Sequence, residues 1–312
     1  MQRLLTVYNP NSSNFCKVES GVLTKVADFK GCMKGKYAVK KTSFDENVKT
    51  LASLLKDGDF VLAAGGDATA AIAANAIMKS GKDATLAVLP YGNFNDLART
   101  LGTMDFRDIF ATSSGAEDKI PTTSRNLYPL EIIVDGKFFR YATCYVTIGM
   151  TAEAVELFDE PKFRKYMQKG HKSSWRSYLA LAKWYFKNRH KKTFIPPFTL
   201  NGNPTDPKTS DYAAVSGRSM CRVMKGGDDY LKPSVFRSKN LRTVSFPKLT
   251  ALMIKSILKR TPGDETHGDV LEFLQPATVE VQAEGEYRVF KDIHTIEIKK
   301  SPRPLKVFHG RS

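Results

Sequence analysis

The sequence predicts an α/β domain at the N-terminus, with a doubly wound parallel sheet, followed by a mostly β sandwich domain that carries a helical insertion. Two observations lead to this prediction. In the first hundred residues, short apolar runs alternate with segments of helical periodicity, which is typical of a parallel sheet with helices on both faces. From about residue 120, strand-like runs follow one another between turn residues. A chain of 312 residues is long enough for two domains that fold without disulfide bonds.

The expected elements of the first domain, residues 1–120, alternate in type along the chain. Strands are expected at residues 3–8, 37–40, 60–64 and 85–89, and helices at 45–56, 69–78 and 93–101. The last two strands are almost entirely apolar, as strands buried on both faces of a sheet are. In such sheets, ligands bind beyond the carboxyl ends of the strands.

The second domain, residues 121–300, is expected to consist mainly of β-strands. Residues 130–134 and 138–145 predict a hairpin that turns at Asp135-Gly136, since an Asp-Gly pair favours a two-residue turn. Further strands are expected at 243–246, 279–283 and 295–299. The polar stretch 201–210 contains two prolines and predicts an exposed loop.

The charge of the chain indicates an anionic partner. The formal net charge is +16, which favours a nucleic acid, a membrane surface or a phosphorylated ligand. The segment Pro161–Lys192 holds eleven Lys or Arg residues and no Asp or Glu, interleaved with aromatic residues. This composition predicts binding to an anionic membrane surface; the alternative is an amphipathic helix that packs on the β domain and leaves a solvated basic face. Nucleic-acid binding is the least favoured option, because no recognised nucleic-acid motif is present.

Cysteine content and hydropathy indicate a cytoplasmic protein. The four cysteines form no C-x-x-C pair, so reduced thiols are expected rather than a zinc site or disulfide bonds. The N-terminus becomes polar at Asn9, too early for the apolar region of a signal peptide. No run of about 18 uninterrupted apolar residues is present, so membrane contact is expected to be peripheral.

Three polar segments each follow an expected strand of the first domain: Asn9–Ser13, Gly65–Thr69 and Pro90–Asp96. In a parallel sheet all three open on the same edge. Paired glycines let backbone N–H groups approach an anion closely, and the N-terminus of the helix near Thr69 can seat a phosphate. Asp67 can hold Mg²⁺ directly or through water. One such segment alone is more simply a turn or a helix cap, but the three together predict a phosphate-binding site.

These segments resemble the catalytic domain of the diacylglycerol kinase family, which includes soluble bacterial lipid kinases and sphingosine kinases. That family carries N-P-x-S-G, G-G-D-G-T and P-x-G-T-x-N-D at similar spacings. Tyr145–Glu153 is similar to its central glycine segment, and Glu284-Gly285-Glu286 to its acidic D-G-E turn. The resemblance implies an NAD kinase/diacylglycerol kinase-like fold in which segment 301–312 returns to the first domain. It also implies ATP-dependent phosphorylation of the hydroxyl of diacylglycerol or a similar lipid, with Mg²⁺.

The resemblance further implies which residues act. Glu286 is expected to accept the hydroxyl proton, with Glu284 and Asp67 as the other catalytic acids and Asp67 as the magnesium ligand. The expected ATP-binding residues lie on the three polar segments and at one further position: Asn9, Pro10, Asn11, Ser12, Ser13, Thr42, Gly65, Gly66, Asp67, Ala68, Thr69, Gly92, Asn93, Asn95 and Asp96. The expected partners are a lipid substrate and a membrane surface, and a homodimer is left open.

Several positions depart from the family pattern. Ala68 and Ser13 replace glycines, Asn93 replaces threonine, and Glu284 replaces aspartate. The Ala68 methyl group is expected to crowd a phosphate or to forbid a positive φ angle. Many bacterial members hold a structural Mg²⁺ with an Asp-Gly pair where this chain has Lys239-Asn240, so that metal site is expected to be absent. The alternatives are therefore a nucleotide- or lipid-binding homologue with weakened catalysis and, third, a soluble-substrate kinase of the NAD kinase type.

Overall fold

The computed structural model of the chain divides into two compact units. Unit 1 comprises Met1–Tyr128 and Pro302–Ser312, and unit 2 comprises Pro129–Ser301. The structure describes residues 2–10, 12, 15–92, 95–103, 105–110, 120–153, 183–184, 186–187, 195–217, 219–220, 224–225, 234–239, 264–265, 268–284 and 286–309. The expected strand at 243–246 and nearly all of the basic segment Pro161–Lys192 lie outside the described residues.

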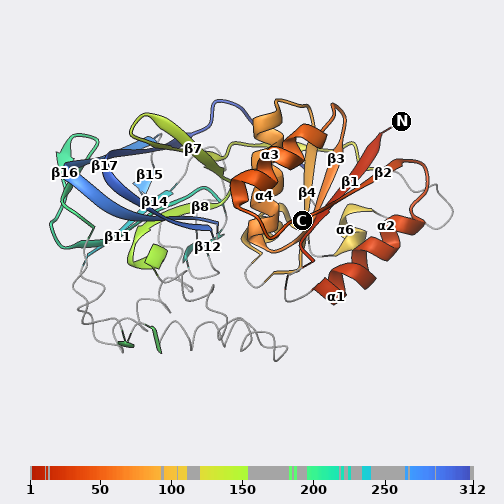
Figure 1. Cartoon of the computed structure of the whole chain (residues 1–312), viewed down its shortest axis with the longest axis horizontal. Helices are drawn as coiled ribbons and strands as arrows, with labels where there is room; N and C mark the ends of the chain where they lie inside the picture. Colours follow the sequence, from red (N-terminus) through yellow and green to blue (C-terminus); the bar gives the residue numbers. More distant parts are fainter. Residues whose placement is uncertain are drawn as a thin grey trace. The chain divides into compact units, whose positions relative to one another are not determined.

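Unit 1 is built on a six-stranded sheet in the order β2-β1-β3-β4-β18-β5 (Figure 1). Its strands are β1 Arg3–Tyr8, β2 Met33–Ala38, β3 Phe60–Gly65, β4 Thr85–Pro90, β5 Arg125–Leu127 and β18 Leu305–Val307. All neighbours are parallel except β18 and β5, which are antiparallel. The C-terminal strand β18 therefore lies inside the sheet of unit 1, between β4 and β5.

Helices cover both faces of this sheet. They are α1 Phe15–Val18, α2 Thr24–Asp28, α3 Phe44–Leu54, α4 Asp67–Ser80, α5 Asp96–Leu101 and α6 Phe106–Ile109, with the π-helical turn η1 Glu19–Leu23 between α1 and α2. In Figure 1, α3 and α4 lie on one side of the strands, and α1, α2 and α6 lie on the other. On the second side, Val18, Val22 and Val26 belong to one apolar cluster with Phe60 and Phe110. The expected α/β fold of the N-terminal unit is thus confirmed.

The sequence prediction missed the helical segment between β1 and β2. Gly21 lies in the middle of it, where glycine is unfavourable for helix formation. The structure gives the reason for this glycine: a Cβ atom at Gly21 would lie 2.8 Å from the hydroxyl oxygen of Tyr91. The π-helical turn also interrupts the 3.6-residue period, so the apolar pattern of a single helix is absent. No helix in the described part of the chain is long and apolar enough to cross a membrane.

One buried side chain, Asn47 of α3, holds the segment between β2 and α3. Its Oδ1 accepts hydrogen bonds from the Tyr37 hydroxyl and from the backbone N–H of Lys40, both at 2.9 Å. Its Nδ2 donates to the Lys40 carbonyl oxygen and to Thr42 Oγ1, both at 3.2 Å. A capping box at Ser43 fixes the start of the helix. The position of Thr42 therefore depends on Asn47.

Unit 2 is a mostly antiparallel β-structure, as expected. Its main sheet follows the order β15-β14-β11-β8-β16-β17-β6-β7, with β9 beside β16 and β10 beside β9. The strands are β6 Leu130–Val134, β7 Lys137–Ala142, β8 Tyr145–Gly149, β9 Phe198–Leu200, β10 Asn203–Pro204, β11 Thr209–Val215, β14 Ser234–Lys239, β15 Asp264–Glu265, β16 Gly268–Ala283 and β17 Glu286–Lys300. A separate described pair consists of β12 Ser219–Met220 and β13 Met224–Lys225.

A long hairpin of β16 and β17 dominates unit 2 (Figure 1). These strands have 16 and 15 residues, so the expected strands 279–283 and 295–299 are only parts of them. The pairing register shifts between Glu272 and Ala277, a stretch that includes Pro276. Such an irregularity breaks the alternation of apolar and polar residues, which explains why the sequence pattern indicated two short strands.

Two further expectations for unit 2 were wrong. The stretch 201–210 is not one exposed loop, because β10 and the start of β11 lie in it. Asn201 and Gly202, with φ of 52° and 76°, form the two-residue turn between β9 and β10, which an Asn-Gly pair favours. Residues 138–145 are not one strand: β7 ends at Ala142 and pairs with β6, whereas β8 begins at Tyr145 and pairs with β11 and β16.

We expect Asn47→Ala to lower the free energy of unfolding by about 2–3 kcal/mol, because the Lys40 N–H loses its side-chain acceptor and the buried Tyr37 hydroxyl loses the shorter of its two bonds to Asn47. Urea denaturation measures this loss. Lys49→Ala, on the exposed side of the same helix, is the control and should change the free energy by less than about 0.5 kcal/mol. Equal losses in the two variants would contradict the role given to Asn47.

Candidate active site

Three loops of unit 1 leave the carboxyl edge of the sheet side by side. The strands β1, β3 and β4 are parallel neighbours, with Tyr8 opposite Ala64 and Gly65 opposite Pro90. The loops after these strands are the three polar segments that the sequence singled out. Because ligands of such sheets bind outside the carboxyl ends of the strands, this edge is the candidate site of unit 1.

The loops after β3 and β4 touch through two glycines. A Cβ atom on Gly92 would lie 2.4 Å from the Cα of Gly66, and a Cβ atom on Gly66 would lie 3.2 Å from the Cα of Gly92. A Cβ atom on Gly65 would lie 2.5 Å from Thr69 Oγ1. The glycines are therefore required by the close approach of the two backbones, which side chains would prevent.

The carboxylate of Asp67 ties the same two loops together. Its Oδ2 accepts a hydrogen bond from the backbone N–H of Asn95 at 3.0 Å, and its Oδ1 accepts one from the N–H of Asp96 at 2.7 Å. Asn95 has φ 54°, in the left-handed region. The Asn95 side chain closes its own loop, since its Oδ1 accepts from Gly92 N at 2.7 Å and its Nδ2 donates to Gly92 O at 2.8 Å.

A second carboxylate, that of Asp96, lies near Asp67. Burial raises the pKa of Asp67 to about 6, and the negative charge of Asp96 adds to this shift; the two backbone N–H donors and Arg99 oppose it. Asp96 is fully buried and forms an ion pair with Arg99. Two acidic groups thus share one guanidinium, so a bound cation would be favourable at this edge.

Ala68 lies in the first turn of α4 and is not among the residues with positive φ. The expectation that its methyl group forbids a required positive φ angle is therefore wrong. The extended residue before the helix is Gly66, with φ −89° and ψ −175°, and the helix has begun before residue 68. Alanine favours this conformation over glycine by about 1 kcal/mol. Crowding of a phosphate by the methyl group stays a prediction.

The loop after β1 contributes a hydroxyl group. The backbone N–H of Ser12 donates to the carbonyl oxygen of Asn9 at 3.1 Å, which closes a turn directly after the strand. Ser12 Oγ is buried and has no hydrogen-bond partner among the described residues, and neither has the buried Nη1 of Arg99. Buried polar atoms are normally satisfied by protein, water or ligand. The expected site residues Asn11, Ser13 and Asn93 lie outside the described residues.

The residues at this edge fit a magnesium nucleotide. Each oxygen of the Asp67 carboxylate accepts one N–H and keeps a further lone pair. Mg²⁺ usually binds one or two carboxylates and takes its other ligands from phosphates and water. Within the described ranges, no three His, Cys, Asp or Glu side chains gather into a metal-binding group. The N-terminus of α4 and the Ser12 hydroxyl would supply hydrogen bonds to phosphate.

In unit 2, Glu284 and Glu286 flank the turn between β16 and β17, and their surroundings differ. Glu284 is 3% exposed, and its Oε1 accepts hydrogen bonds from the Thr143 hydroxyl and the Cys144 backbone N–H. Glu286 is half-buried and is the first residue of β17, opposite Ala283. The two acids of this turn therefore differ in their access to a substrate.

Glu286, Arg288 and Phe290 share one face of β17, because side chains alternate along a strand. The Phe290 ring packs edge-on against Phe139, with ring centroids 4.9 Å apart. The Arg288 guanidinium carbon lies 5.1 Å from the centroid of Phe139 and 5.5 Å from that of Phe290, distances typical of cation–π interactions. The more accessible acid is thus followed along its strand by a cationic and an aromatic side chain.

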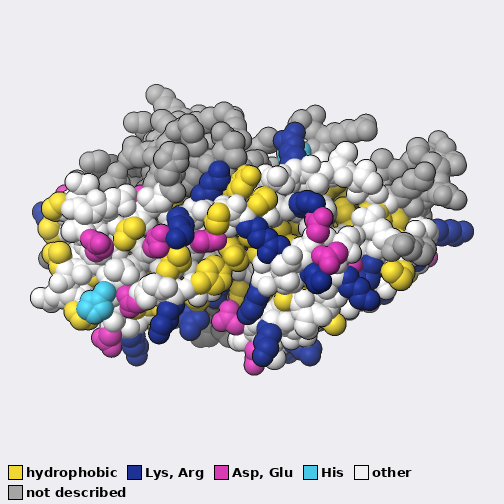
Figure 2. All heavy atoms as spheres, turned by 90° about the horizontal axis from the view of Figure 1, so that it is seen from above, with side chains coloured by type: hydrophobic (Ala, Val, Ile, Leu, Met, Phe, Trp, Pro, Cys, Tyr) yellow, Lys and Arg dark blue, Asp and Glu magenta, His cyan; other side chains and the backbone are white. Residues whose placement is uncertain are grey.

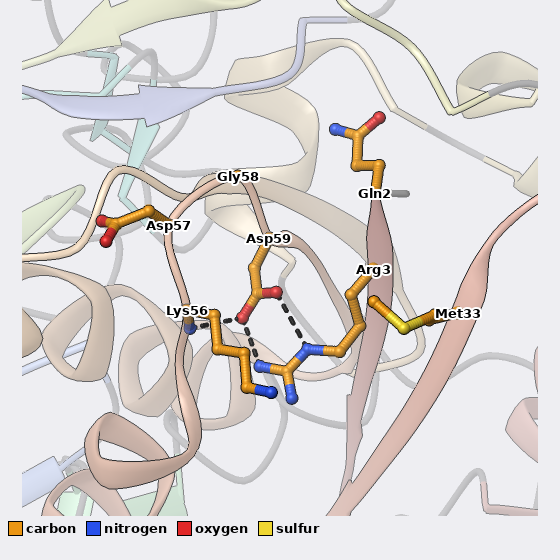
Figure 3. Close-up of a pocket in the computed structure, with 7 residues that line it drawn as sticks. All are labelled: Gln2, Arg3, Met33, Lys56, Asp57, Gly58 and Asp59. Carbon is orange, nitrogen blue, oxygen red and sulfur yellow. Dashed lines mark hydrogen bonds and ion pairs between the residues drawn. The ribbon is translucent and has the colours of Figure 1, made fainter.

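A pocket of about 270 Å³ lies at the other edge of the unit 1 sheet (Figure 3), lined by Gln2, Arg3, Met33, Lys56, Asp57, Gly58 and Asp59. Arg3 begins β1 and Asp59 precedes β3, so this pocket is at the amino edge, away from the polar loops. Its central carboxylate, Asp59, is already paired: it accepts from Arg3 Nε at 2.9 Å and from Lys56 N at 2.7 Å. These contacts tie β1 to β3, and we assign the pocket a structural role.

Sequence reasoning missed Arg99 and Thr143. Arg99 follows Asp96 by three residues on α5, and an acid–base pair at this spacing on a helix is a detectable signal. Thr143 contacts Glu284 across 141 residues of sequence, and no local pattern encodes such a contact.

Residues 3–121 match the family model of the diacylglycerol kinase catalytic domain, so the resemblance seen in the motifs is confirmed. The fold of the chain is similar to a crystal structure of a diacylglycerol kinase from Bacillus anthracis str. Sterne, with a TM-score of 0.61 and 16% identity over 99% of this chain and 97% of that one. A second structure from this organism, of a protein proposed to be a diacylglycerol kinase, gives a TM-score of 0.62 and 15% identity over 100% and 99%. No curated protein sequence matches the chain. The N-terminal domain is thus similar in sequence to the diacylglycerol kinase catalytic domain, and the whole chain is similar in fold to these two structures.

We expect Gly92→Ala to separate the two loops, because the added Cβ would collide with the backbone of Gly66. The free energy of unfolding should fall by about 2–3 kcal/mol, the range for a steric insertion into a packed site. Gly58→Ala is the control: its φ is +81°, with nothing within 4 Å of the added Cβ, so only backbone strain of about 1 kcal/mol applies. A smaller loss for Gly92→Ala than for Gly58→Ala in urea denaturation would refute the close contact.

The pKa of Asp67 predicts a pH dependence of stability in the metal-free protein. An unfolded aspartate has a pKa of about 3.9, and that of Asp67 is raised to about 6 in the folded chain. Between these values the folded state binds more protons, so the contribution of Asp67 to stability falls as pH rises through the window and is constant above about pH 7. Urea denaturation in EDTA, compared with Asp67→Asn, isolates this contribution. A difference between the two proteins that is constant from about pH 4 to 7 would contradict it.

Proposed function

We propose that this protein transfers the γ-phosphoryl group of ATP to the hydroxyl group of diacylglycerol or a similar lipid. The observation that carries the proposal is the joining of the loops after β3 and β4 by Asp67 at the carboxyl edge of a parallel sheet, within the segment that matches the kinase domain model. Phosphoryl transfer needs the phosphates held, charge neutralised and the acceptor oxygen placed in line, and it requires little covalent chemistry from the protein.

Each part of the proposed site has a separate task. The loop after β3 and the N-terminus of α4 bind phosphate oxygens through backbone N–H groups. Asp67 holds Mg²⁺, which supplies charge neutralisation when bound. Without a bound cation, Asp67 and Asp96 would repel a polyphosphate. Arg99 is the one positive charge among the groups that shift the pKa of Asp67. Glu286 accepts the proton of the lipid hydroxyl as it attacks.

We propose that the protein binds its lipid substrate at an anionic membrane surface. On the face shown in Figure 2, Lys and Arg side chains lie among Asp and Glu side chains across the described surface. Eleven basic residues without an acidic one are found instead in Pro161–Lys192. Each basic residue near such a surface contributes about 1 kcal/mol of binding free energy. We therefore propose that the protein is cytoplasmic and that it associates peripherally with membranes through this segment.

One ground for the weakened homologue, a backbone conformation that alanine cannot adopt, does not apply, because Ala68 lies in a helix that alanine favours over glycine. The match of residues 3–121 to the diacylglycerol kinase model also favours a lipid acceptor over a soluble one.

The test is transfer of labelled phosphate from ATP–Mg²⁺ to lipid by the full chain, with vesicles that contain diacylglycerol, a sphingoid base or an isoprenoid alcohol. We expect a phosphorylated lipid with at least one acceptor. Glu286→Gln should lower kcat by about 100-fold or more, the usual contribution of a general base.

Glu297→Gln is the matched control, because it makes the same charge change on the same strand at an ion pair with Lys299 on the surface. It should leave kcat within about twofold. Absence of any labelled lipid from a folded protein would refute the proposed function, and full activity in Glu286→Gln would refute the role of this acid.

A further inference from the structure

Thr143 and Cys144 form a turn that binds Glu284 inside unit 2. This turn joins β7 to β8, and both residues are buried, with exposed fractions of 0% and 2%. Its backbone is held from the other side: Ser216 N and Gly217 N donate to the Cys144 carbonyl oxygen at 2.7 and 3.1 Å. Ser216 Oγ donates to the Thr143 carbonyl oxygen at 3.1 Å. The Thr143 hydroxyl and the Cys144 N–H therefore present two fixed donors.

Glu284 accepts hydrogen bonds from these donors while its own backbone is in a strained conformation. Its φ is 52°, in the left-handed region, which costs a non-glycine residue roughly 1–2 kcal/mol. Such a conformation persists only where its surroundings determine it. Here the carboxylate oxygen Oε1 accepts both donors, and a hydrogen bond to an ionised acceptor is stronger than a neutral one. The two contacts thus stabilise the turn between β16 and β17.

The position of Glu286 follows from that of Glu284. Only one residue separates them, and Glu286 begins β17 by pairing with Ala283. A change in the turn conformation would alter the position and direction of the Glu286 side chain at the start of β17. A misplacement of a reacting group by about 1 Å can cost up to 100-fold in rate. The buried acid can therefore influence chemistry that takes place at the accessible one.

We infer that Glu284 is a positioning residue, held by Thr143 and Cys144, and that it sets the orientation of Glu286 without taking up a proton itself. This inference rests on the proposed function in that Glu286 is the proton acceptor. Its physical basis is accessibility: the Glu284 carboxylate is buried against two protein donors, whereas Glu286 is half-buried at the start of a strand. The replacement of aspartate by glutamate at position 284 is compatible with this role, because the longer side chain reaches donors on another strand connection.

Two buried threonines provide a matched comparison. Thr147 lies on β8, is also 0% exposed, and its hydroxyl donates to Gln282 Oε1 on β16 at 2.7 Å. Like the Thr143 contact with Glu284, this is a buried hydroxyl bound to a side-chain oxygen near the end of β16. It does not hold the turn. Thr143→Val and Thr147→Val each remove one buried hydroxyl donor, which binds a carboxylate in the first case and an amide oxygen in the second. Only the first acts on the turn before Glu286.

The experiment compares kcat and the ATP KM of the full chain for Thr143→Val, Thr147→Val, Thr143→Ser and Glu284→Gln. Thr143→Val should lower kcat by about ten- to a hundredfold, with the ATP KM unchanged within about threefold, because the nucleotide loops belong to unit 1. Thr147→Val should stay within about threefold of wild type, and Thr143→Ser should restore most of the activity. Glu284→Gln keeps the acceptor oxygen and should retain at least about a tenth of kcat, unlike Glu286→Gln.

Amide hydrogen exchange of residues 284–290 gives a readout that needs no turnover. Thr143→Val should increase the exchange rate of this peptide about tenfold, and Thr147→Val should leave it within about twofold of wild type. If wild-type protein phosphorylates no lipid, the proposed function fails, and the exchange data still decide whether Thr143 holds the turn. Equal exchange in both valine variants, or a loss in Glu284→Gln as large as that in Glu286→Gln, would overturn the inference.

Discussion

The carboxylate of Asp67 is the interaction on which the organisation of unit 1 depends. It comes directly after β3 and bonds to two consecutive backbone N–H groups that follow β4, 28 and 29 residues later. The glycine contact between the same loops brings their backbones to a distance that side chains would prevent. Without the carboxylate, two buried N–H groups would lose their acceptor, so the polar edge of the sheet is held by a group that also carries the charge needed for a metal ion.

The strands β3 and β4 and the helices that follow them could be predicted, because these central parallel strands are almost entirely apolar and their loops are polar. The convergence of the loops after β1, β3 and β4 followed from the same rule. Asn95 could not be predicted in its left-handed conformation, because its backbone is stabilised by Asp67 and Gly92 from outside its own helix. In unit 2, the register shift in β16 and the separate pairing of β7 and β8 depend on strands that are distant in sequence, which local periodicity does not record.

The acids Glu284 and Glu286 show how packing distinguishes residues of the same chemical type. They are separated by one residue, and the motif resemblance implied that Glu286 accepts the proton and that Glu284 is a further catalytic acid. Glu284 is buried against the turn at Thr143 and Cys144, and its carboxylate accepts hydrogen bonds from both residues. The other lies at the start of a strand beside an arginine that aromatic rings hold. The burial of Glu284 and its hydrogen bonds depend on a turn that is distant in sequence, so the sequence did not reveal how the surroundings of the two acids differ.

The insertion of β18 between β4 and β5 has a consequence for how the protein is made. During synthesis on the ribosome, β1 to β4 emerge first, but the strand that completes their sheet follows the whole of unit 2. Until then β4 has an open side, β5 has no partner in this sheet, and the apolar cluster lacks Phe308. The nascent N-terminal unit is therefore exposed to mispairing for the time needed to translate some 170 further residues.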